Sequence, residues 1–212
     1  LTLNAKLELD NGGELRASGN ATVTSKAAGG LTFTTTNNVI VSAGKTLTLA
    51  AEGAGTIVGA ADDLKLSDLG TLTLKTPVRT VDDLRIEDGG TLVVDVDDAL
   101  PALAATGLNN IAKGNLVVNA EDFGSAATVL TLEDGELMLE TSMKDTLKTV
   151  KVENGSLREA QGVKIGDGAN GELTLGAPSK MGHLDLGGDM TLAKLTTAAN
   201  VDNTIKVASG KA

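Results

Sequence analysis

The sequence contains no cysteine, no tryptophan and no tyrosine, and only two phenylalanines, Phe33 and Phe123, among 212 residues. Without cysteine, neither a disulfide framework nor a thiolate metal site can form. A single histidine, His183, removes most triad and histidine-based metal chemistry. Because aromatic side chains usually supply much of the buried area of a core, this core must be built from leucine, valine, isoleucine and alanine.

Basic residues are also few, since 18 lysines and arginines stand against 28 acidic residues, which gives a net charge of -10. Such a surface repels phosphate backbones, so we expect no nucleic-acid partner. No apolar run approaches the ~20 residues needed to cross a bilayer, so we expect no membrane insertion by this segment. The acidic, cysteine-free composition, rich in glycine, threonine and asparagine, favours an extracellular or bacterial cell-surface location.

One short unit recurs along the chain. It has an apolar residue, then an aspartate, asparagine or small residue, then glycine, then leucine within an apolar alternation. Its copies are Leu9–Leu15, Val41–Leu49, Leu66–Leu74, Ile86–Val94, Leu132–Leu139, Val152–Leu157, Ile165–Leu175 and Leu184–Leu192, with a weaker copy at Gly114–Val118. The alternation predicts short strands with one buried face, and the glycine is expected to supply a backbone that tolerates positive φ at a turn.

The spacing of these glycines predicts how the strands are arranged. Gly70 and Gly90, and likewise Gly135 and Gly155, are 20 residues apart, which is the size of one solenoid coil. We therefore predict an all-β fold, a parallel β-solenoid of about ten coils with aliphatic side chains stacked inside. A β-sandwich of hairpins remains the alternative, because its short strands would give a similar pattern.

The chain shows no composition break that would divide it, so we expect a single β-solenoid domain over residues 1–212. Because the sequence opens on Leu-Thr-Leu, we also expect it to be a fragment of a longer chain. The alanine- and leucine-rich segment 97–114 departs from the repeat and is expected to form a short helix or loop outside the coil.

The segments Val41–Leu49, Leu66–Leu74 and Ile86–Val94 carry the repeat most clearly. In this pattern the chain resembles the passenger region of bacterial autotransporter proteins. That resemblance implies a right-handed parallel β-helix displayed on the outer surface, commonly an adhesin or an aggregation factor.

Candidate catalytic and metal-binding residues are weak. The adjacent pairs Asp62-Asp63, Asp82-Asp83 and Asp97-Asp98 would point to opposite faces of a strand. A sugar-cleaving cleft would also need aromatic platforms that the composition does not provide. Asp95 and Asp97 could face the same side of a strand, yet calcium requires six to eight oxygen ligands. We therefore expect no enzyme, no catalytic residue, no cofactor and no metal site.

The sharpest candidate site is a threonine-rich outer face. If the leucines that follow each glycine point inward, the alternating threonines point outward and align between coils. The predicted binding residues are Thr46, Thr48, Thr71, Thr73, Thr91 and Thr174. The alternative is that threonine is simply a good strand residue on a solvated face.

These observations favour a structural or adhesive β-helix that mediates cell-cell or cell-surface contact through a repetitive outer face. Its expected partners are other copies of itself or cell-surface ligands. One alternative is a self-assembling surface-layer or filament subunit that forms homo-oligomers. The second is a carbohydrate-active β-helix enzyme.

Overall fold

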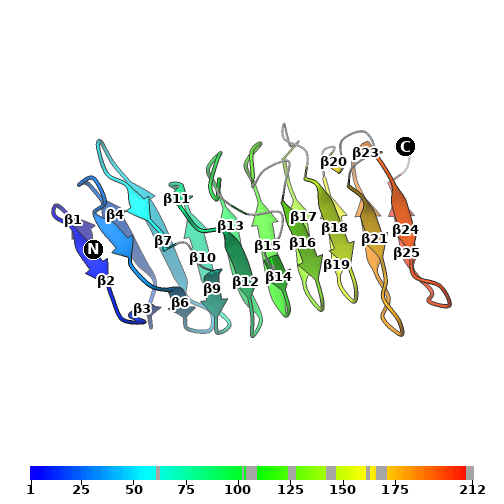
Figure 1. The fold of residues 1–212 in the computed structure, drawn as a ribbon, viewed down its shortest axis with the longest axis horizontal. Helices are drawn as coiled ribbons and strands as arrows, with labels where there is room; N and C mark the ends of the chain where they lie inside the picture. The colour runs from blue at the N-terminus through cyan, green and yellow to red at the C-terminus, as the bar shows by residue number, and fades with distance from the viewer. Residues whose placement is uncertain are drawn as a thin grey trace.

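The computed structural model describes residues 1–60, 63–101, 103, 109–123, 128–141, 147–160, 163–165 and 171–208. In these residues the chain forms strands and turns that climb in one direction as a parallel β-solenoid of about eight turns. Figure 1 shows the coils following one another along the long axis, from β1 at one end to β25 at the other. The described part has no helix long and apolar enough to span a membrane.

The longest sheet, which we call sheet A, contains ten strands. In spatial order they are β1 (Thr2–Leu3), β4 (Ala21–Ser25), β7 (Thr46–Ala51), β10 (Thr71–Leu74), β13 (Gly90–Val94), β15 (Gly114–Val118), β17 (Glu136–Leu139), β19 (Ser156–Glu159), β22 (His183–Leu186) and β25 (Thr204–Val207).

Sheet C forms a second side of the column with nine strands. In spatial order they are β3 (Glu14–Ala17), β6 (Asn37–Val41), β9 (Asp63–Ser67), β12 (Asp83–Ile86), β14 (Asn109–Ile111), β16 (Val129–Leu132), β18 (Thr149–Val152), β21 (Leu173–Leu175) and β24 (Leu195–Thr197).

Two smaller sheets complete the column. Sheet B consists of β2 (Leu7–Leu9), β5 (Leu31–Phe33), β8 (Ile57–Val58) and β11 (Val78–Arg79), and sheet D consists of β20 (Val163–Ile165) and β23 (Met190–Leu192). Successive coils therefore run from sheet A through sheet B or D, where these are present, to sheet C and back to sheet A.

Strand pairing within all four sheets is parallel, as in the register of β10 with β13 and of β9 with β12. The predicted parallel β-solenoid is therefore confirmed, because a sandwich of hairpins would pair its strands antiparallel. The expected number of ten coils is approximate, since the column makes about eight turns.

The segment 97–114 is a correction to the sequence prediction. Its described residues contain no helix: Asn109–Ile111 is strand β14, and Gly114 begins β15. Ala99 and Leu100 are fully buried in the core rather than lying outside the coil. Residues 102 and 104–108 lie outside the described residues.

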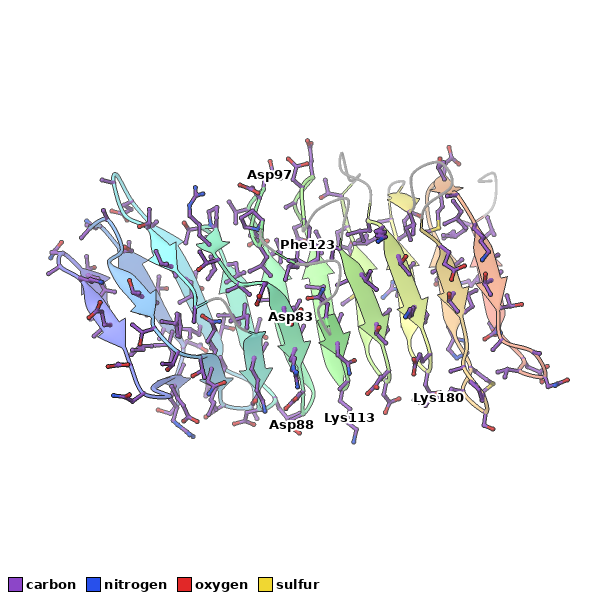
Figure 2. All side chains as sticks on the ribbon, viewed as in Figure 1. Asp83, Asp88, Asp97, Lys113, Phe123 and Lys180 are labelled. Atoms are coloured by element: carbon purple, nitrogen blue, oxygen red, sulfur yellow. The ribbon has the colours of Figure 1, made fainter. Side chains whose placement is uncertain are left out.

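The core is a stack of aliphatic side chains in register. Along sheet A, one inward row consists of Leu47, Leu72, Leu92, Leu116, Leu137, Leu157 and Leu184, each at most 2% exposed. Both aromatic residues, Phe33 and Phe123, are buried in this core as well. Phe123 is labelled in Figure 2. Neither ring offers a stacking platform to a ligand on the surface.

The glycine at the corner between sheets C and A has a different role from the one we expected. At several corners the positive φ falls on an earlier residue, such as Asp68 at 73° or Asp88 at 57°. The glycine before the strand is needed because the neighbouring coil is too close: a Cβ on Gly155 would collide with the carbonyl oxygen of Gly135. Close stacking of coils, more than turn geometry, therefore explains this glycine.

Candidate functional site

Five of the six predicted threonines lie together on the outer face of sheet A. Thr46, Thr71 and Thr91 form one row in register, and Thr48 and Thr73 belong to the next row. Thr174 does not join them. It lies on β21 of sheet C, in register with Lys151 and Thr196. Leu173–Leu175 precedes a corner instead of following one, which places its outward threonine on another side of the column.

The outward residues of β7, β10, β13 and β15 form a continuous surface that we call the uncharged strip. It consists of Thr46, Thr48, Thr71, Thr73, Thr91, Val93, Asn115 and Val117. The strip has no charged residue, although charged residues make up 22% of the chain. On sheet C, by contrast, the outward row of the same region includes Lys65 and Arg85. The absence of charge is therefore particular to one face.

The strip is flat and offers unused polar groups. Thr73 is only 8% exposed, because it is packed between Thr48 and Val93 of the adjacent coils. Asn115 Nδ2 donates to Thr91 Oγ1 at 3.2 Å. The hydroxyls of Thr48 and Thr71 have no hydrogen-bond partner among the described residues, so they remain available to an external partner.

The uncharged strip ends where charges begin on the same face. After β15 the outward positions hold Glu136 and Arg158, whose side chains pair at 3.6 Å. Further on, Lys206 Nζ lies 3.4 Å from Asp185 Oδ2. These exposed pairs occupy each other, so this part of sheet A is a mixed-charge face.

The corner between sheets C and A contains the largest groove found in the described residues, of about 390 Å³. Its lining residues are Glu87, Asp88, Ala112, Lys113, Glu133, Asp134, Asn154 and Lys180. Figure 2 shows Asp88, Lys113 and Lys180 along the same lower edge of the column. Ion pairs hold two of the carboxylates, Glu87 with Lys65 at 2.9 Å and Glu153, beside the groove, with Lys180 at 3.3 Å.

The acidic residues considered for calcium bind the next coil. Asp95 Oδ1 accepts a hydrogen bond from Asn119 Nδ2 at 2.7 Å, and Asp97 Oδ1 accepts one from the Glu121 amide at 2.8 Å. Asp97 lies at the upper edge in Figure 2, opposite the groove. Within the described ranges, no group of three or more histidine, cysteine, aspartate or glutamate residues could hold a metal ion.

His183 lies at the start of β22, where its side chain is exposed on the outer face of sheet A. Its register neighbours are Ser156 and Thr204, so the acidic Asp185 is not beside it across the strands. The adjacent pair Asp82-Asp83 flanks the start of β12. Asp62 and the side chain of Asp63 lie outside the described residues.

Sequence reasoning missed a buried carboxylate. Glu159 is 3% exposed and occupies an inward position of β19, in register with Leu139 and Leu186. Its Oε2 accepts a hydrogen bond from the Gly188 amide at 2.9 Å. The signal was present in the sequence, because Glu159 stands where the alternation after Leu157 calls for an apolar residue.

A second polar feature lies on sheet C beside Thr174. Lys194 Nζ is 2.7 Å from Glu172 Oε2, and Thr196 Oγ1 donates to the same oxygen at 2.9 Å. The hydrogen bond from Lys194, followed by that from Thr196, holds the pKa of Glu172 below its usual value. Thr174 therefore belongs to a polar ion-pair surface rather than to the uncharged strip.

Comparisons with protein-family models, with curated proteins and with solved structures found no match to this chain. The resemblance to autotransporter passenger regions is therefore supported at the level of the β-helix fold alone.

Proposed function

We propose that this chain is a structural and adhesive β-helix that makes contacts between cells through the uncharged strip of sheet A. The observation that carries the proposal is the strip itself, a registered, charge-free face on a protein with a net charge of -10. Its location would be the bacterial cell surface or the extracellular space. The proposal involves contact and includes no catalytic step, cofactor or metal.

Desolvation favours this face over the others as a contact surface. Bringing a charged group out of water costs far more than removing water from a threonine or a valine. Thr48 and Val93 can therefore be covered at low cost, whereas covering Lys65 or Arg85 on sheet C would need matched counter-charges. The threonine hydroxyls can exchange hydrogen bonds with a partner and so give the contact direction.

The partner that best fits the strip is the same strip on a second copy. A charged ligand would find no counter-ion there, whereas two flat sheet faces pack at about 10 Å with their side chains interdigitated. Each copy repeats the strip over four coils, so many weak contacts between two cells would add up through multivalency. The acidic residues elsewhere on the column would limit non-specific association.

The test is clumping of beads coated with the purified protein. We expect wild-type beads to clump and beads carrying Thr48→Lys with Val93→Lys to stay dispersed, because both lysines would be buried between two strips. The matched control is Thr131→Lys with Thr196→Lys, which adds the same charge at half-buried outward positions of sheet C. The control should clump as the wild type does.

Two outcomes would overturn the proposal. Strip variants that clump like the wild type would show that the strip is not the contact surface. Wild-type beads that never clump, but bind to cells lacking this protein, would replace the second copy with another cell-surface ligand.

A further inference from the structure

The two ends of the column have complementary surfaces. At the C-terminal end, β25 and β24 pair with the preceding coil through β22 and β21, and no described strand covers their other edges. At the N-terminal end, β1 and β3 are edge strands in the same two sheets. Figure 1 shows these edges at opposite ends of the long axis. Each end therefore presents unpaired backbone amides and carbonyls.

The C-terminal end also exposes side chains that point into the column. Ile205 and Val207 are in register with the buried Leu184 and Leu186, yet they are 47% and 46% exposed. Leu195 is in register with the fully buried Leu173 and is 42% exposed. These residues continue the rows of the core but lack a coil to cover them.

The N-terminal end has matching apolar residues. Leu1 is 70% exposed. Leu7, Leu9 and Leu15 are only partly buried, although each is in register with a fully or almost fully buried residue of the next coil. The two ends thus share a three-sided outline whose interior is apolar and whose strand edges are open.

We propose that copies of this chain stack end to end, so that β25 and β24 of one copy pair in parallel with β1 and β3 of the next. A second copy is the occupant because each end supplies what the other needs: parallel strand edges and inward aliphatic side chains. Since side chains alternate with period two, any register that keeps the inward rows inside sets Val207 against Leu1 or Leu3. When Ile205 meets Leu1, the outward Lys206 adjoins the uncharged Thr2, so no like charges oppose each other there.

Such a contact is head-to-tail, and because the coils climb along one axis it produces linear filaments rather than closed dimers. It uses the ends of the column and is independent of the uncharged strip on its side. The weight-average mass of the wild-type chain should therefore rise with concentration in analytical ultracentrifugation, and electron micrographs should show thin unbranched rods.

The blocking variant is Ile205→Lys. In the single chain this position is half exposed, so the fold should tolerate lysine, whereas in the stack the charge would be buried. The matched control is Thr204→Lys, which adds the same charge at the adjacent exposed position, facing outward on the same strand. We expect Ile205→Lys to be monomeric at every concentration and Thr204→Lys to form rods like the wild type.

A mixing experiment identifies the two ends. A second variant, Leu1→Lys with Leu7→Lys, blocks the N-terminal end and keeps the C-terminal end intact. Alone, each variant should remain monomeric, and an equal mixture should give dimers and nothing larger. A monomeric wild type, dimers that form from either variant alone, or rods that persist in Ile205→Lys would each overturn end-to-end stacking.

The two proposals fail separately. Thr48→Lys with Val93→Lys should abolish bead clumping and leave the rods intact, whereas Ile205→Lys should abolish the rods and leave the strip intact.

Discussion

Single residues in this protein are constrained by the coil above or below them more than by their neighbours in sequence. The corner glycines show this best. A glycine before an apolar alternation can be found in the sequence, and its usual explanation is turn geometry. In the structure, Gly135 and Gly155 instead allow two backbones to approach each other, a long-range contact that a reading of one repeat cannot detect.

Replacing Gly155 with alanine should destabilise the protein by about 1–3 kcal/mol, the usual cost of forcing extra volume into a packed site. The cause is the collision of the new Cβ with the Gly135 carbonyl. The free energy of unfolding in urea measures the effect. Gly19→Ala is the control, because a Cβ there meets nothing within 4 Å and the position has no positive φ. Equal stabilities of the two variants would contradict this explanation.

At the scale of strands, buried polar residues bridge adjacent coils. Asn109 on β14 is 1% exposed in an inward row between Leu84 and Leu130. Its Oδ1 accepts a hydrogen bond from the Leu84 amide at 2.8 Å, and its Nδ2 donates to the Val129 carbonyl at 3.0 Å. The apolar alternation would have placed a leucine here, so the bridge is a feature of the structure that the repeat pattern did not predict.

Asn109→Leu should therefore be destabilising, although leucine fits the row. The substitution leaves a buried amide and a buried carbonyl without this partner, at a cost of about 1–3 kcal/mol. We expect a lower free energy of unfolding and faster hydrogen exchange at the Leu84 amide. Asn110→Thr, at the adjacent outward position, should change neither quantity by more than about 0.5 kcal/mol. An Asn109→Leu protein as stable as the wild type would disprove the bridging role.

At the scale of the whole molecule, the column is close to one-dimensional, because each coil contacts mainly the coils before and after it. Gly90 and Gly114 are register partners, so residues 90–113 make up one coil. The stability of the column should then be approximately a sum over coils and the interfaces between them.

Deleting residues 90–113 should therefore shorten the column by one coil and preserve the fold. Gly114 would follow Gly89 and enter sheet A in the place of Gly90, which keeps the apolar rows aligned. Far-UV circular dichroism should retain the β-sheet spectrum, and unfolding should remain cooperative. Deleting residues 90–101, about half a coil, should prevent folding because the remaining strands lose their register. Equal damage from the two deletions would argue against independent coils.

The sequence by itself determined the parallel β-solenoid, its aliphatic interior and most of its inward and outward positions. These follow from local alternation, since a side chain next to a buried one on a strand must face outward. It did not determine which side of the column each strand occupies. Thr71 and Thr174 lie in similar Leu-Thr-Leu contexts, yet one is on sheet A and the other on sheet C. That difference depends on how much chain each coil uses in its loops and corners, which only the stacking of coils on one another decides.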